Sequence, residues 1–205
     1  MAHVHQPSRL TMVTECVAVS GTVKELRYKP HDGDYWILVE PDPAFVELLA
    51  PSNEGTLIVE VTPTDQPFVY LPKAGQHATF YGSLVQDKAH ESWTEVHPAW
   101  LITTLDIKVE ATPSVRVGDE LRISITATST LDGVARPVSQ VGLFVELVSS
   151  EGEAVRWPFA RTNTRGVATV NLSALESPGE YTLWVYGYKG QEIGFSSTTV
   201  EIRRR

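Results

Sequence analysis

Residues 14–26 read Thr-Glu-Cys-Val-Ala-Val-Ser-Gly-Thr-Val-Lys-Glu-Leu, and this stretch decides the fold class. Its side chains alternate with a period of two, so that Val17, Val19 and Val23 fall on one side of an extended chain. Such alternation is the signature of a β-strand with one buried face. Gly21 interrupts the strand, and the usual reason for a glycine there is a bulge or a barrel bend.

The same period continues through the first half of the chain. It predicts further strands at residues 35–39, 56–61, 76–85 and 93–102. Five such strands favour a small closed barrel, because closure removes the exposed edges of the sheet. We therefore expect an OB-like five-stranded barrel over residues 1–103. The one predicted helical turn is 44–49, with Asp42 as its cap and Pro43 at its first position.

The spacing of the predicted strands changes near Leu105, after which strands recur at regular intervals with turn residues between them. The predicted strands are 105–111, 120–128, 141–148, 154–160, 167–172, 181–188 and 193–202. Seven strands in about 100 residues is typical of an immunoglobulin-like β-sandwich. The sequence therefore predicts an all-β protein with two domains, 1–103 and 104–205, joined near Thr103 and Thr104.

Two segments of the second half carry a resemblance. They are residues 162–172, Thr-Asn-Thr-Arg-Gly-Val-Ala-Thr-Val-Asn-Leu, and residues 178–185, Pro-Gly-Glu-Tyr-Thr-Leu-Trp-Val. Together they resemble bacterial immunoglobulin-like domains of the invasin and macroglobulin kinds. The resemblance implies a spacer, a stalk or a binding surface. In such a sandwich Tyr181 is expected to form a tyrosine corner, with its hydroxyl on a nearby backbone group.

The first half resembles a group of uncharacterised prokaryotic OB-like domains. The matching pieces are Asp32-Gly-Asp-Tyr35, Pro72-Lys-Ala-Gly75 and Glu95-Val-His-Pro98. Trp36 stands where the pattern of the group has a histidine. The resemblance implies no function that could be carried over to this chain.

The net charge of −8 is unevenly shared between the two halves. Residues 1–103 carry 13 acidic and 6 basic side chains, giving −7, whereas residues 104–205 carry 12 and 11, giving −1. An acidic barrel repels phosphate backbones, so nucleic-acid binding is disfavoured. The basic end, 203–205, is expected to be solvated.

Cys16 is the single cysteine, which excludes an internal disulfide, and its apolar alternating surroundings predict a buried, inert thiol. No apolar run reaches the roughly 18–20 residues that a membrane helix needs, so no membrane insertion is expected. The start of the chain lacks the apolar core of a signal peptide. A cytoplasmic location is slightly favoured, unless the chain is processed or belongs to an extracellular or virion assembly.

The densest group of polar side chains is His90, Glu91, Glu95 and His97. On a strand, Glu95 and His97 point to the same face, about 6–7 Å apart. The preferred interpretation is a hydrogen-bonded pair that locks the last barrel strand. A ligand-contacting polar patch is one alternative. A zinc site of His90, Glu95 and His97 is another, although their spacing matches no standard zinc signature. We expect no metal and no cofactor.

Three tryptophans of the first half form a candidate stacking surface for bases or sugars: Trp36, Trp93 and Trp100. Trp93 and Trp100 are seven residues apart and face opposite sides of an unbulged strand, so we expect at least one of them in the core. The acidic loop residues Asp32, Asp34, Glu40 and Asp42 have no calcium-loop spacing and are expected to be solvated.

Motifs for catalysis are missing from the sequence. It contains no Gly-x-Ser-x-Gly and no phosphate-binding glycine loop, and Cys16 has no histidine near it in sequence. The prediction is a non-catalytic binding or structural assembly module, with a protein partner or self-assembly favoured. The alternatives are an OB-type binder of oligosaccharide or single-stranded nucleic acid, and a metal-dependent hydrolase that uses His90, Glu95 and His97.

Overall fold

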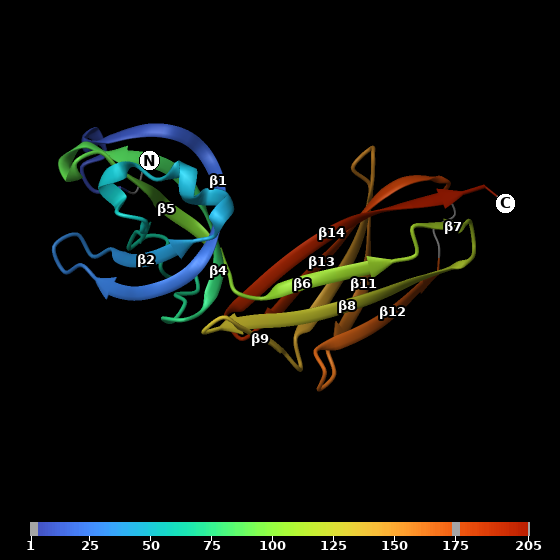
Figure 1. Ribbon diagram of the computed structural model, residues 1–205. Helices are drawn as coiled ribbons and strands as arrows, with labels where there is room; N and C mark the ends of the chain where they lie inside the picture. The colour runs from blue at the N-terminus through green and yellow to red at the C-terminus, as the bar shows by residue number, and fades with distance from the viewer. Residues whose placement is uncertain (1–3, 174–176, 205) are drawn as a thin grey trace. The chain divides into compact units, whose positions relative to one another are not determined.

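The computed structural model describes residues 4–173 and 177–204 and is built almost entirely of strands (Figure 1), which confirms the all-β prediction. Its contacts divide the chain into two compact units. The first comprises Met1–Thr104 and Thr130–Val134, and the second comprises Leu105–Ser129 and Ala135–Arg205.

The first unit is a closed five-stranded barrel with the strand order β1-β2-β3-β5-β4. Its strands are β1 (Leu10–Tyr28), β2 (Tyr35–Pro41), β3 (Leu57–Val61), β4 (His77–Asp87) and β5 (Trp93–Thr103). Short 3₁₀ turns connect them: η1 (Pro7–Arg9), η2 (Pro43–Leu48), η3 (Pro51–Asn53) and η4 (Lys88–His90). The long β1 closes the barrel, because it pairs with β4 along its first part and with β2 along its last part.

Gly21 lies at the residue where β1 changes partner. It is paired with Ala78 of β4 and with Pro41 of β2. A Cβ at this position would lie 2.4 Å from the backbone oxygen of Glu40. The glycine therefore permits a close approach of two strands at a barrel bend, which is the role that its mid-strand position indicates.

Two local predictions about the barrel are wrong. Cys16 is exposed, because it lies on the face of β1 opposite to that of the buried Val19 and Val23. Asp42 stands at the N-cap of η2 without a side-chain capping bond. Its carboxylate instead accepts hydrogen bonds from the Ser20 hydroxyl and from Nε2 of His77.

The second unit is an immunoglobulin-like sandwich of two sheets. One sheet has the order β11-β10-β13-β14-β7, and the other has the order β12-β8-β6 with β9 added to β8. The strands are β6 (Asp106–Ala111), β7 (Ser114–Arg116), β8 (Glu120–Leu131), β9 (Val134–Pro137), β10 (Gly142–Ser149), β11 (Ala154–Arg161), β12 (Val167–Ser173), β13 (Gly179–Lys189) and β14 (Glu192–Arg203). The predicted number of seven strands is too low, since β7 and β9 are too short to show a period.

Each unit has its own apolar core. Inward side chains such as Ile37, Val59 and Phe80 fill the barrel. Leu121, Ile123 and their neighbours fill the space between the two sheets of the sandwich. At the corner before β13, the hydroxyl of Tyr181 donates a hydrogen bond of 3.1 Å to the backbone oxygen of Ser177. The predicted tyrosine corner is thereby confirmed.

Candidate functional site

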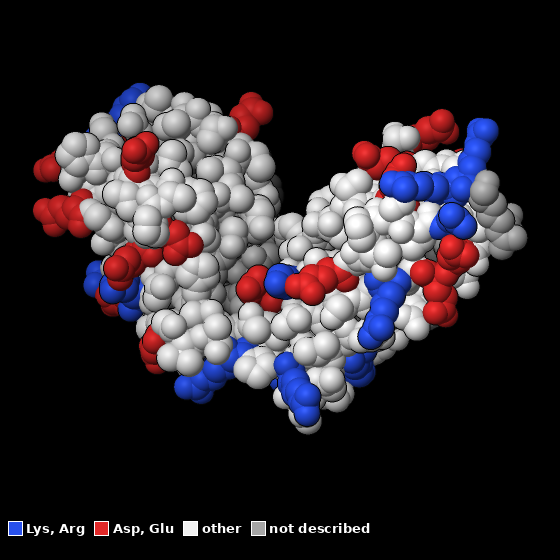
Figure 2. Space-filling view, turned by 45° about the vertical axis from the view of Figure 1, so that its right-hand side comes forward, with Lys and Arg blue, Asp and Glu red and all other residues white. Residues whose placement is uncertain are grey.

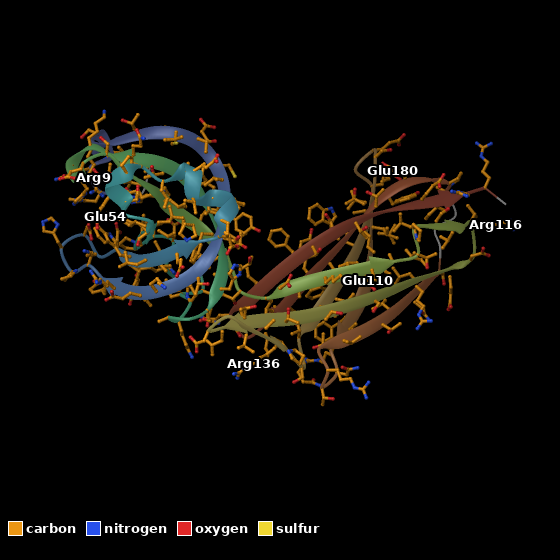
Figure 3. All side chains as sticks on the ribbon, viewed as in Figure 1. Arg9, Glu54, Glu110, Arg116, Arg136 and Glu180 are labelled. Carbon is orange, nitrogen blue, oxygen red and sulfur yellow. The ribbon has the colours of Figure 1, made fainter. Side chains whose placement is uncertain are left out.

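Buried charged and polar side chains gather at one end of the barrel. We call them the buried acid cluster, and its members are Asp34, Glu60, Asp87, Glu95 and His97. Four elements or loops supply them: the turn before β2, the middle of β3, the end of β4 and the first part of β5. Arg9, labelled in Figure 3, belongs to the turn that leads into β1 and reaches the same cluster. Barrel closure thus brings together residues that are far apart in the sequence.

Glu95 and His97 form the pair that the sequence predicts. Oε1 of Glu95 lies 3.1 Å from Nδ1 of His97, and both side chains are fully buried. The other carboxylate oxygen of Glu95 accepts a hydrogen bond of 3.1 Å from Nε1 of Trp93. Strand alternation explains the arrangement, because residues two apart on β5 face the same side. β5 continues past Pro98 to Thr103, and its pairing with β4 shifts register between Gly82 and Leu84, opposite His97 and Pro98.

His90 does not join this pair. Its Nδ1 lies 2.8 Å from Oδ2 of Asp87, and its ring stacks on Trp93 at 4.4 Å. Asp87 also accepts a hydrogen bond of 2.7 Å from Nη1 of Arg9. The predicted alternative of a metal trio made of His90, Glu95 and His97 is therefore not the grouping that the fold assembles.

Two carboxylates that the sequence analysis missed lie against His97. Oε2 of Glu60 is 3.1 Å from Nδ1, and Oδ2 of Asp34 is 3.8 Å from Nε2. Asp34 is buried, so the expectation that it is a solvated turn residue is wrong. Glu60 did offer a local signal: it is the one acidic residue in the strand Leu57–Val61, every residue of which is buried.

Burial weakens the acidity of the cluster. It raises the pKa of Glu60 to about 8, and the neighbouring charge of Glu95 adds to the effect. It likewise raises the pKa of Glu95 to about 7, with a further contribution from Asp87. Burial, followed by the charge of Asp32, raises the pKa of Asp34. The pKa of His97 is lowered by burial, which disfavours its charged form. The site therefore resists holding several bare charges at once.

A surface pocket of about 350 Å³ lies beside the cluster. Arg9, Lys29, His31, Trp36 and His90 are among the residues that line it. Arg9 connects the two features, because it lines the pocket and also bonds to buried Asp87. The pocket could receive a small polar ligand at the barrel end.

Two of the three candidate tryptophans pack together beside this pocket, and Trp36 lines it. The rings of Trp36 and Trp93 are 5.5 Å apart, and His90 contacts both. The ammonium of Lys29 covers the Trp36 ring at 3.4 Å from its centroid. Trp100 is 40% exposed, and the ring contacts described for this group do not include it. Since Trp93 is also partly accessible, the expectation that one of the pair lies in the core is wrong.

The other acidic loop residues lie outside the cluster. Glu40 is exposed and pairs with Lys24, and half-exposed Asp42 pairs with His77. Asp32 accepts a hydrogen bond of 3.3 Å from the backbone N–H of Asp34. These contacts are typical of surface turns and neighbouring strands.

Comparisons with known proteins identify no family. No family model matches the chain, and no curated protein matches it. Among the described residues, no helix has the length and apolar character needed to cross a membrane.

Comparison with solved structures gives matches of low similarity. The superoxide reductase (neelaredoxin) of Ignicoccus hospitalis is 10% identical, with a TM-score of 0.37, over 47% of this chain and 80% of that one. The elastase-activated α-2-macroglobulin of Escherichia coli is 10% identical, with a TM-score of 0.43, over 93% of this chain and 24% of that one. A CARDB domain of Pyrococcus furiosus is 11% identical, with a TM-score of 0.32, over 48% of this chain and 86% of that one. The class of this protein is therefore defined by its own topology, a closed barrel followed by an immunoglobulin-like sandwich.

Proposed function

We propose that this chain is a non-catalytic binding module that docks a protein partner on one face of its sandwich. The observation that carries the proposal is a set of aromatic side chains in two neighbouring groups on the outer face of the five-stranded sheet. We call it the aromatic face, and its members are Phe144, Phe159, Trp184, Tyr186, Tyr188 and Phe195.

Strand alternation builds the aromatic face. On β13 the even-numbered side chains 184, 186 and 188 point outward, while Leu183 and Val185 point into the core. Tyr186 lies directly opposite Phe144 of β10 on one side and Phe195 of β14 on the other. Cross-strand neighbours of this kind touch, so the three central strands present one connected surface.

The aromatic rings stack on one another but remain accessible to solvent. Phe144 stacks with Tyr188 at 5.8 Å, and Trp184 stacks with Tyr186 at 6.1 Å. Phe144 nevertheless remains 49% exposed and Tyr186 41% exposed. Contiguous exposed apolar patches on soluble proteins commonly mark interaction sites, and Tyr, Trp and Phe are enriched at protein interfaces.

Charge supports the sandwich as the docking unit. Residues 104–205 carry 12 acidic and 11 basic side chains, whereas residues 1–103 carry 13 and 6. Figure 2 shows red and blue side chains interspersed on the visible face of the sandwich. A nearly neutral surface of mixed sign repels a protein partner less than the acidic barrel does.

The test uses the double variant Phe144→Ala, Tyr186→Ala of the full chain. Sedimentation velocity measures self-association, and affinity capture with quantitative mass spectrometry measures other partners. Phe68→Ala is the matched control, because Phe68 is an aromatic residue of the barrel that is 83% exposed. We expect the wild type and Phe68→Ala to bind a protein partner or a second copy of the chain, and we expect the double variant to lose this binding. Equal association by all three proteins contradicts the proposal.

The barrel pocket supports a second candidate function, the binding of an acidic oligosaccharide. Arg9 and Lys29 supply positive charge, and Trp36 and His90 supply rings at the same cavity. We expect a glycan with carboxylate groups to perturb the Trp36 indole signal in NMR titrations of the wild type. The perturbation should be lost in Lys29→Ala and kept in Lys73→Ala, an exposed lysine elsewhere on the barrel. Identical shifts in both variants exclude this pocket as the binding site.

A further inference from the structure

Three members of the buried acid cluster have polar atoms that lack a hydrogen-bond partner among the described residues. These atoms are Oδ2 of Asp34, both carboxylate oxygens of Glu60 and Nε2 of His97. All three side chains are almost completely buried. The remaining two members differ, since Asp87 is bonded to Arg9 and His90, and Glu95 is bonded to Trp93 and His97.

An arrangement of this kind is costly unless each of these groups gains a partner. A buried polar atom without a partner costs about 1–3 kcal/mol, and a buried charge costs more unless it is paired or binds a metal. Arg9 is the one guanidinium that reaches the cluster from the described residues, and its nearest nitrogen lies 3.8 Å from Glu60. One distant cation does not neutralise the carboxylates of Asp34 and Glu60 together.

We propose that Asp34, Glu60 and His97 bind a divalent transition-metal ion, Zn²⁺ or Mn²⁺. Each residue offers one ligand atom, and these atoms all lie within 4.8 Å of one another. A single ion between them would give every unpartnered group a partner and would add two positive charges. The imidazole nitrogen favours a transition metal, because Ca²⁺ and Mg²⁺ prefer sites made of oxygen alone.

The surrounding side chains prepare His97 for this role. Oε1 of Glu95 and Oε2 of Glu60 each lie 3.1 Å from Nδ1, and Glu95 is the hydrogen-bond partner of this nitrogen. A proton held on Nδ1 leaves Nε2, which is 3.8 Å from Oδ2 of Asp34, with a free lone pair. Trp93 in turn fixes the carboxylate of Glu95. A carboxylate behind a metal-binding histidine is a common way to set the tautomer and the orientation of its ring. Glu95 is therefore a positioning residue in this proposal.

The surface pocket lies next to the cluster. Arg9 lines the pocket and contacts Glu60 and Asp87 of the cluster, and its side chain is 16% exposed. A second group of potential ligands, His5, His31 and Asp32, lies at the surface of the same pocket. These residues are accessible and could hold an ion without the buried cluster, so the experiment must separate the two groups.

The experiment measures metal binding by the full chain. The protein is stripped with EDTA, and Zn²⁺ or Mn²⁺ is titrated by calorimetry, with metal content counted by mass spectrometry after gel filtration. We expect one ion per chain. Asp34→Asn and Glu60→Gln keep the size of each side chain and remove its charge, and each should weaken binding by at least about tenfold. Electron paramagnetic resonance of the Mn²⁺ form should show coupling to one imidazole nitrogen.

Two controls identify the residues that bind. His31→Ala removes a ligand of the surface group, and His77→Ala removes an exposed carboxylate-bound imidazole elsewhere on the barrel. Both should bind the ion as the wild type does. The proposal is overturned if the wild type binds no ion, which would leave a shared proton or a water molecule as the partner of these groups. It is equally overturned if His31→Ala abolishes binding while Asp34→Asn and Glu60→Gln retain it.

Discussion

At the scale of single residues, the barrel contains acids whose protonation is tied to folding. Glu60 is fully buried, and burial raises its pKa from 4.5 to about 8. The folded protein therefore holds this proton more tightly than the unfolded chain does. The resulting stabilisation is complete below the unfolded pKa of 4.5 and is lost as the pH rises through about 8. Glu95, with its pKa raised to about 7, acts in the same direction.

We accordingly predict that the metal-free protein loses thermal stability between about pH 6.5 and 8.5. The contribution of His97 to stability depends on pH in the opposite direction. Because its pKa is lowered, His97 stabilises the folded protein above the usual pKa of 6.5, and this stabilisation is lost as the pH falls. The change in stability over this pH range therefore reports on the ionisation of the carboxyl groups. Thermal melts of Glu60→Gln in EDTA should show a flatter dependence on pH than the wild type. Glu40→Gln, at an exposed position, should keep the wild-type slope. A slope that is unchanged in Glu60→Gln would mean that Glu60 is ionised in the folded protein.

Tyr181 supports a second prediction at this scale. Its hydroxyl bonds to the backbone oxygen of Ser177 at 3.1 Å, while its ring lies in the sandwich core. Tyr181→Phe keeps the ring and removes the bond, so it should cost about 1 kcal/mol of unfolding free energy. Urea denaturation measures the change. Tyr28→Phe is the control, because Tyr28 is 56% exposed and its loss of a hydroxyl should have little effect. Equal stability of the wild type and Tyr181→Phe would count against a structural bond.

At the scale of elements, β1 is the strand on which barrel closure depends. Gly21 pairs with both β2 and β4, and a Cβ there would meet the Glu40 oxygen at 2.4 Å and Cγ1 of Val39 at 2.7 Å. The neighbouring backbone cannot move without disturbing a ladder on each side. We predict that Gly21→Ala destabilises the barrel by about 1–3 kcal/mol, the usual cost of overpacking.

Chemical denaturation with a barrel tryptophan as the probe tests this prediction. Val13→Ala is the matched substitution, because Val13 lies on the same strand and is 53% exposed. Its effect should stay within about 0.5 kcal/mol. If Gly21→Ala is as stable as Val13→Ala, the two strands can separate at the bend without loss.

The strands also show what sequence alone can and cannot predict. Long strands such as β1 and β13 can be predicted from the period of two in their hydrophobic pattern. The spacing of Glu95 and His97 correctly places these two residues on one face of their strand. β7 and β9 have only three and four residues, too few for a period to be visible. The prediction for Cys16 is wrong because the same period places it on the face of β1 opposite to the buried Val19 and Val23.

The candidate site was predictable only in part, for a related reason. Glu95 and His97 belong to one strand, so their proximity follows from local geometry. Asp34, Glu60, Asp87 and Arg9 come from four other places in the chain, and only the pairing of β3 with β5 and the closure of β1 on β4 bring them together. Non-local pairing of this kind leaves no spacing rule in the sequence.

At the scale of the whole molecule, the described residues of each unit form a large apolar core of their own. The cluster around Leu121 lies within residues 105–202, and the cluster around Phe80 lies within residues 19–102. We predict that fragments 1–103 and 104–205 each fold, since each retains its own core. Two-dimensional NMR should give dispersed amide signals for both. Collapsed spectra from both fragments would show that each unit needs the other.

The parallel pairing of β7 with β14 determines how the sandwich would respond to a stretching force. β7 runs parallel to β14, with Ser114 opposite Glu201 and Arg116 opposite Arg203. When the two ends of the sandwich are pulled apart, these parallel strands are drawn in opposite directions along their length. Their hydrogen bonds then bear the force together, in shear, whereas the bonds of a hairpin pulled from its open end break one after another. The parallel pair would therefore resist such a pull more than a hairpin that is opened from its end.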